Sequence, residues 1–189
     1  MNMNGNVLQR NISKVFPNRI TATAAEIIIL FLMGALAMFL HAKLRIPMHL
    51  PGRNGLIFMM IVVSACTASE YSFSASIICL GSASLLLATN LGFSDPFMPV
   101  VYLLLGFFID LFLGIARAIR SNVFIIAVAS GLSWMLIPVI RTGVSFISGF
   151  TYNSLMGGIA YPLFTHFIFG FVGGLIGAVL IYLAGKSQK

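Results

Sequence analysis

The chain has 189 residues, of which 59% are hydrophobic and only 8% are charged, and its mean hydropathy is +1.04. Soluble domains carry roughly a quarter charged residues, so this composition excludes a water-soluble fold and predicts an integral membrane protein. The net charge of +7 does not indicate nucleic-acid binding, because the basic residues lie at the ends of apolar runs.

The apolar runs predict an all-α bundle of six transmembrane helices, because each span needs about 20 apolar residues. A polar segment, 1–19, precedes a single six-helix domain, 20–184, and a short tail, 185–189, follows it. The expected helices are Ile20–Ala42, Leu56–Ala68, Phe73–Leu91, Val100–Ala116, Val123–Ile140 and Pro162–Ala184.

The connections between these helices differ in character. The segment 44–55 holds two prolines and two glycines, so it is an irregular loop that cannot face lipid. The apolar stretch 56–90 is too long for one span, and we place a tight turn at 69–72. Loops are also expected at 91–99 and at 141–158, where glycine, serine, threonine and asparagine are frequent.

Positive charges predict the orientation, because short cytoplasmic loops are enriched in lysine and arginine. With six spans, seven of the 11 basic residues share the side of the two termini and four lie on the other side. Both termini are therefore expected in the cytoplasm of a cell-membrane protein. Lys43, Arg45 and Arg53 in the first outer loop run against this rule, which invites a functional explanation.

The outer ends of the helices collect polar and aromatic side chains, which are the groups that a small polar ligand needs. The alternative for each of them is a membrane-interface anchor or a contact with lipid headgroups. The predicted ligand-binding residues are His41, Arg45, His49, Arg53, Asn54, Asn90, Asp95, Trp134, Tyr152, Asn153, Tyr161 and His166. Pro47, Pro51, Gly52 and Gly55 are expected to stiffen the first loop.

Polar and small residues inside the spans are expected to act in packing. Glu26 and Asp110 need partners because charges in a membrane are costly, and we expect Asp110 to share a salt-bridge network with Arg117. Gly106 and Gly114 flank Asp110 at four-residue spacing.

The last helix carries overlapping GxxxG spacings at Gly170, Gly173, Gly174 and Gly177, which predict a close approach to a helix of this chain or of a partner. Cys66 and Cys79 have no metal-site spacing and are interpreted as packing residues.

Common catalytic motifs are missing from the sequence. It contains no Walker A loop, GxSxG or HExxH motif and no paired catalytic carboxylates on one face, so neither an enzyme nor direct ATP hydrolysis is expected. We likewise expect no metal centre and no bound cofactor.

Two segments carry a family resemblance. Lys43-Leu-Arg-Ile-Pro-Met-His-Leu-Pro51 after an Ala- and Gly-rich helix, and Gly92-Phe-Ser-Asp-Pro-Phe-Met-Pro-Val-Val-Tyr-Leu-Leu-Leu-Gly106, resemble the membrane-embedded substrate-binding S components of energy-coupling factor (ECF) transporters, biotin-type members in layout. The likeness covers nearly the whole chain in architecture.

The resemblance implies a six-helix protein that captures a vitamin or related micronutrient outside the cell. A transmembrane coupling subunit and two cytoplasmic ATPases would then drive uptake, and the segment 43–54 would act as a lid or ligand loop. The first helix departs from the family, because it has no Ala-x-x-x-Ala pattern for docking on the coupling subunit. Thr21, Ala25 and Gly34 are substitutes, and Glu26, Asp110 and Arg117 are further docking or structural residues.

Three hypotheses follow from these features. The first is a substrate-binding subunit of an ATP-driven importer, whose outer Lys, Arg and His residues suit a ligand with a carboxylate or phosphate. The second is a self-sufficient ion-coupled carrier or small channel, motivated by Asp110 and Glu26. The third is a membrane assembly protein, motivated by the glycine face of the last helix.

Overall fold

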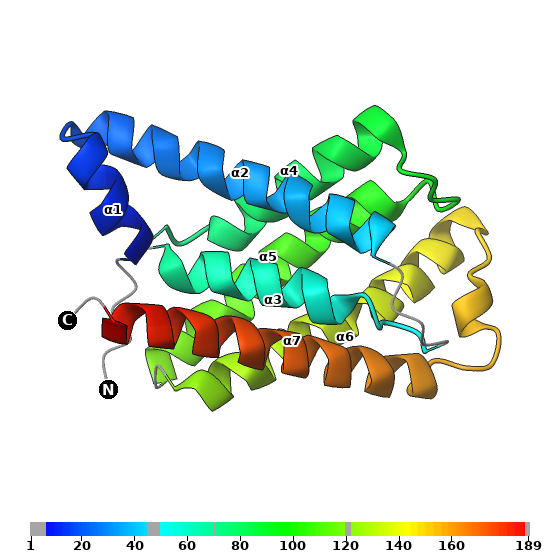
Figure 1. Cartoon of the computed structure of the whole chain (residues 1–189). Helices are drawn as coiled ribbons and strands as arrows, with labels where there is room; N and C mark the ends of the chain where they lie inside the picture. Colours follow the sequence, from blue (N-terminus) through cyan, green and yellow to red (C-terminus); the bar gives the residue numbers. More distant parts are fainter. Residues whose placement is uncertain (1–6, 45–49, 70, 120–121, 188–189) are drawn as a thin grey trace.

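The computed structural model describes residues 7–44, 50–69, 71–119 and 122–187, and every regular element in these ranges is a helix (Figure 1). The elements are α1 Val7–Val15, α2 Arg19–Lys43, α3 Gly55–Ala68, α4 Ser74–Thr89, α5 Met98–Ile119, α6 Val123–Ser148, the short 3-10 helix η1 Asn153–Leu155, and α7 Ala160–Ser187. The six apolar helices expected from the sequence are all present.

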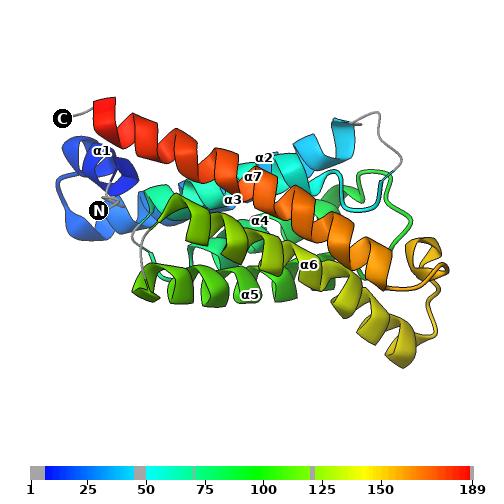
Figure 2. The same ribbon diagram turned by 90° about the horizontal axis from the view of Figure 1, so that it is seen from below.

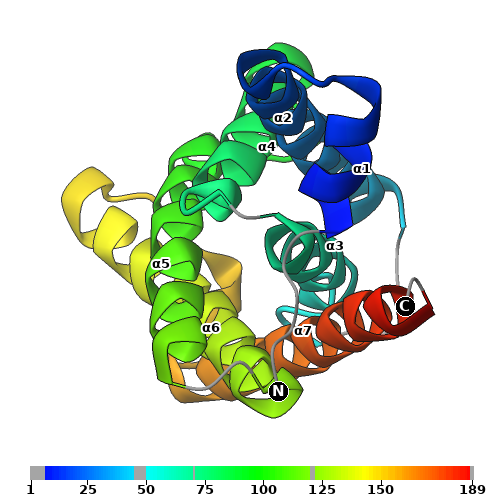
Figure 3. The same cartoon turned by 90° about the vertical axis from the view of Figure 1, so that its left-hand side faces the viewer.

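The six apolar helices form a closed ring of neighbours. Helix α2 packs on α4, α4 on α5, α5 on α6, α6 on α7, α7 on α3, and α3 on α2, as the end-on view shows (Figure 3). Every residue of α3 is buried or half-buried, and three consecutive ones, Ile61, Val62 and Val63, are buried. This helix is therefore largely enclosed by its neighbours.

Helix length and surface chemistry identify a multi-pass helical membrane protein. Among the described residues, four helices are long and apolar enough to span a membrane, namely α2, α5, α6 and α7. The two shorter helices, with 14 and 16 residues, measure about 21 and 24 Å. Exposed apolar stripes such as Ile28, Leu32 and Leu36 on α2 are explained by contact with lipid chains.

Two predicted boundaries were wrong. The segment 7–15 of the polar N-terminal region is a helix, α1, which packs against α2 and α3 and buries Ile12. Helix α6 continues eight residues past Ile140, into the segment predicted as a loop. The hydroxyls of Thr142 and Ser148 donate to carbonyls one turn back, so these polar residues are satisfied inside the helix, which ends at the left-handed Gly149.

The glycines of α7 confirm the prediction of close packing, and their neighbours belong to this chain. A Cβ added to Gly173 or Gly177 would lie 2.4 or 2.5 Å from backbone oxygens of α3. Gly170 and Gly174 face α6 in the same way. On α5 the prediction holds for Gly106, which touches α4, but not for Gly114, which has no described atom near its added Cβ.

Both intramembrane carboxylates are satisfied at the end of the bundle that holds α1. Asp110 accepts hydrogen bonds from the backbone N–H groups of Ala75 and Ser76, both at 2.8 Å, and from the Ser76 hydroxyl. These amides open α4 and have no acceptor within it, so Asp110 caps a neighbouring helix. Arg117 was predicted to pair with Asp110, but its side chain is not among those that the structure describes. Glu26 is buried and accepts a 2.5 Å hydrogen bond from Ser69.

The contact between α2 and α4 depends on glycine. A Cβ on Gly34 would lie 1.7 Å from the Ile78 carbonyl oxygen, whereas the Gly114 position is open within the described part of the chain. We therefore expect Gly34→Ala to lower the free energy of unfolding by about 1–3 kcal/mol, since backbone must move. The matched control Gly114→Ala is expected to be neutral or slightly stabilising. Equal stability of the two variants in a detergent–denaturant titration would contradict this close approach.

Candidate functional site

A cavity of about 160 Å³ opens at the end of the bundle opposite to α1. The C-terminal ends of α2 and α6 and the N-terminal ends of α3, α5 and α7 meet there (Figures 1 and 2). Four aromatic rings line it, from His41, Tyr102, Trp134 and His166. The loop before α3 contributes Leu50, Pro51, Gly52, Arg53 and Asn54, and the helices add Met98, Ile137 and Arg141.

Trp134 holds the loop before α3 on the bundle. Its indole N–H donates to the Gly52 carbonyl at 3.2 Å. A Cβ on Gly55 would lie 2.1 Å from the indole nitrogen, so only glycine lets the start of α3 lie against the ring. Gly52 has a φ of 78°, and its own added Cβ would meet His166 at 2.7 Å. The glycines predicted to stiffen this loop thus permit two close contacts.

The two histidines of the cavity are buried and have defined neighbours. The His41 Nδ1 atom lies 3.4 Å from the Tyr102 hydroxyl, and the His41 carbonyl accepts from the Asn54 amide nitrogen at 3.2 Å. His166 stacks on Trp134, with ring centroids 6.2 Å apart. Its Nδ1 atom lies 2.7 Å from the Pro162 carbonyl oxygen. A carbonyl only accepts, so Nδ1 carries the proton and Nε2 of the neutral ring is an acceptor.

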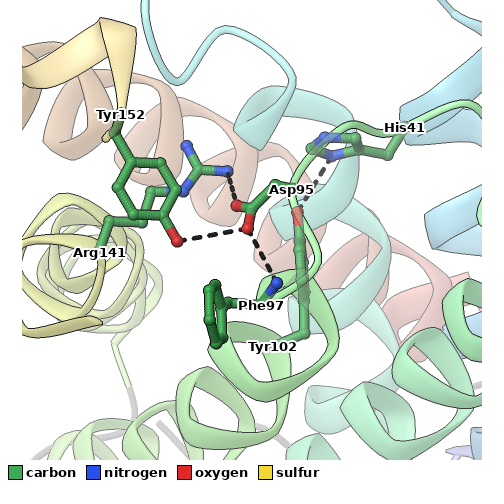
Figure 4. A network of polar contacts seen from close by, with 6 residues as sticks. All are labelled: His41, Asp95, Phe97, Tyr102, Arg141 and Tyr152. Atoms are coloured by element: carbon green, nitrogen blue, oxygen red, sulfur yellow. Dashed lines mark hydrogen bonds and ion pairs between the residues drawn. The ribbon is translucent and has the colours of Figure 1, made fainter. Parts of the chain in front are cut away.

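A cluster of charged and phenolic groups borders the cavity (Figure 4). Asp95 lies 3.5 Å from an Arg141 guanidinium nitrogen and accepts hydrogen bonds from the Phe97 N–H and the Tyr152 hydroxyl. The Arg141 guanidinium also sits over the Tyr152 ring, 5.3 Å from its centroid. The 3.5 Å separation is long for a charge-assisted hydrogen bond, so Asp95 only partly satisfies Arg141.

Several buried polar atoms at this end lack a partner within the described part of the chain. They include Nε of Arg53, Nε of Arg141 and Oδ1 of Asn54, all from residues that line the cavity. A buried donor or acceptor without a hydrogen bond costs roughly 1–3 kcal/mol, and more for a charged group. Such a cost concentrated in one cavity indicates a site that a bound molecule or water completes.

The structure brings together about half of the predicted ligand-binding residues. His41, Arg53, Asn54, Trp134 and His166 line the cavity, and Asp95 and Tyr152 border it. Three others are exposed away from the lining, namely Asn90, Asn153 and Tyr161. Arg45 and His49 lie outside the described residues.

Five residues that line the cavity were not among the predicted ligand-binding or loop-stiffening residues, namely Leu50, Met98, Tyr102, Ile137 and Arg141. Tyr102 carries a usable signal, because it falls in the first turns of the predicted helix that follows Asp95. Met98 and Ile137 carry none, since an apolar residue in an apolar helix has no distinguishing pattern.

The residues predicted for partner docking or structure divide by exposure. Gly34 and Glu26 are buried and have contacts inside the chain, with α4 and with Ser69. Thr21 is exposed, and its hydroxyl donates to the Asn18 carbonyl. Ala25 is half-buried, so Thr21 and Ala25 remain on the surface of α2.

Comparisons with protein-family models, with curated proteins and with solved structures found no match for this chain. The interpretation of the cavity therefore depends on its own geometry.

Tyr152 offers a test of the Asp95 cluster. Burial, and then the negative charge of Asp95, raise the pKa of Tyr152 to about 12. The neutral phenol is thus favoured by folding, so its contribution to stability is present below about pH 10 and is lost as the pH rises through about 12.

We expect Asp95→Asn to lower the Tyr152 pKa but to leave it above about 10, because burial is the larger cause. A pH titration that follows tyrosinate absorbance measures this pKa. The part of the signal that is absent from the Tyr152→Phe variant belongs to Tyr152. Titration of Tyr152 near pH 10 in the unmodified protein would show that the cluster is not formed.

Proposed function

We propose that this chain is the membrane-embedded substrate-binding subunit of an ATP-driven importer of the ECF type. It would capture a small water-soluble nutrient at the outer face of the cell membrane. The observation that carries the proposal is the cavity between the Trp134-anchored loop and the helix ends. Its lining combines aromatic rings with polar atoms that have no partner in the described part of the chain.

The proposed topology has six crossings and both termini in the cytoplasm. The distribution of basic residues supports it, since seven of the 11 lie on the side of the termini. The cavity lies at the opposite end of the bundle, which is the outer face in this topology. Uptake would require a coupling subunit and two ATPase subunits, in agreement with the lack of a nucleotide-binding motif in the sequence.

The ion-coupled carrier and the assembly protein are less well supported, because the residues that suggested them have other roles in the fold. Asp110 accepts three hydrogen bonds as a helix cap, which leaves little reason to assign it to ion coupling. The glycines of α7 face α3 and α6, so they do not offer a free surface for assembly. No catalytic role is proposed for the chain.

The orientation is testable by cysteine labelling from outside intact cells. The two native cysteines are fully buried, so background labelling is expected to be low. Asn153→Cys, at the exposed loop near the cavity, should react with a membrane-impermeant maleimide, and Lys186→Cys should react only after permeabilisation. The reverse pattern would place the cavity in the cytoplasm and contradict the proposed uptake.

Ligand capture is testable with the intrinsic fluorescence of the protein, because its single tryptophan, Trp134, lines the cavity. Addition of a transported nutrient from a panel of vitamins and related compounds should change the emission saturably. Native mass spectrometry of detergent-purified protein should show the same compound retained. Absence of saturable binding across the panel, together with no retained small molecule, would refute the proposed function.

A further inference from the structure

The charges around the cavity are unbalanced. Arg53 and Arg141 line it, and no described lining residue carries a carboxylate. Asp95 stands beside the cavity at 3.5 Å from Arg141, so among the described residues at the cavity two guanidinium groups stand against one carboxylate, an excess of one positive charge. Guanidinium groups stay charged at any accessible pH, and an excess charge is costly where the groups are half-buried, as Arg53 and Arg141 are. A ligand with a single negative charge would neutralise the site.

The remaining polar atoms require donors from a ligand. The Asn54 amide nitrogen is used by the His41 carbonyl, which can only accept, so Oδ1 is the free end of this side chain. His166 donates through Nδ1 to Pro162, and its neutral ring then offers Nε2 as an acceptor. Both groups line the cavity. A complementary ligand therefore carries a hydrogen-bond donor, such as an N–H group, as well as its negative charge.

Shape limits the ligand further. Four flat side chains line a cavity of about 160 Å³. In another protein, an apolar cavity of about 150 Å³ accommodates benzene, so this volume is large enough for one six-membered ring. A flat ring can also pack against the stacked pair of Trp134 and His166.

We propose that this cavity binds a planar single-ring carboxylate that carries an N–H donor. The inference rests on the proposed function and names its substrate class. A carboxylate carries one negative charge, which equals the excess positive charge. It is also flat, so its two oxygens can accept parallel hydrogen bonds from the edge of a guanidinium group. A phosphate monoester carries about −1.5 to −2 charges at neutral pH, which exceeds the excess at the site.

The inference is tested with matched probes in isothermal titration calorimetry of the detergent-purified full chain. 4-Aminobenzoate has the ring, the carboxylate and the N–H donor. 4-Aminobenzamide removes the charge and benzoate removes the donor. Phenyl phosphate, compared with benzoate, replaces the carboxylate by a phosphate. We expect 4-aminobenzoate to bind most tightly, with each of the other three weaker by about tenfold or more.

Variants connect the preference to the proposed contacts. Arg53→Gln should reduce the ratio of 4-aminobenzoate to 4-aminobenzamide affinity at least severalfold, because the amide makes no use of the charge. Arg141→Gln should do the same. If this variant does not fold because it loses the contact with Asp95, Arg53→Gln alone provides the test. Lys186→Gln, on the exposed surface of α7 at the other end of the bundle, should leave the ratio unchanged. Thermal unfolding checks that each variant is folded.

The outcomes separate this inference from the proposed function. Equal or tighter binding of the amide or of phenyl phosphate, or an unchanged ratio in folded Arg53→Gln, would overturn the substrate class and leave substrate capture standing. If no probe binds, the compound that copurifies with the protein is extracted with solvent and identified. A retained planar carboxylate supports the inference, whereas a retained cationic, neutral or phosphorylated compound overturns it. If no compound is retained, both the inference and the proposed function are refuted.

Discussion

The contact between the Trp134 indole and the loop before α3 positions the whole cavity. The indole N–H bonds the Gly52 carbonyl, and the glycine at position 55 leaves room for the ring. The loop is thereby held over α6 and α7, and Arg53 and Asn54 face the space below it. A larger residue at position 55 would push the indole away and separate the loop from the helices that carry His166 and Arg141.

Most of the buried polar atoms that lack a partner in the described chain lie at one end of the bundle. Near α1, the charge of Asp110 is absorbed by the first amides of α4, and Glu26 is bonded to Ser69. At the opposite end, polar atoms of Arg53, Arg141 and Asn54 have no partner in the described chain. Satisfied groups stabilise a bundle, whereas unsatisfied groups raise the free energy of the empty state and so favour a ligand that completes them.

Glycine makes this arrangement possible in a short chain. Gly34 and Gly81 bring α2 and α4 into backbone contact, and the α7 glycines do the same for α3 and α6. Close backbones replace the hydrophobic driving force that is missing between helices in lipid. The remaining width at the cavity end is then filled by large rings, in which Tyr102 packs edge to face against both Phe58 and Trp134.

The amino-acid sequence by itself determined the class of the protein and the places of its six apolar helices, because hydrophobic length and turn residues act locally. It also indicated the first loop and five of the residues that line the cavity. Other features depended on contacts between distant segments. The capping of α4 by Asp110 and the contact of Tyr102 with His41 were decided only by the tertiary structure, since each needs a partner from another helix. The pairing of Arg141 with Asp95 likewise brings together a residue of α6 and a residue of the connection before α5, and no local pattern specifies that distance.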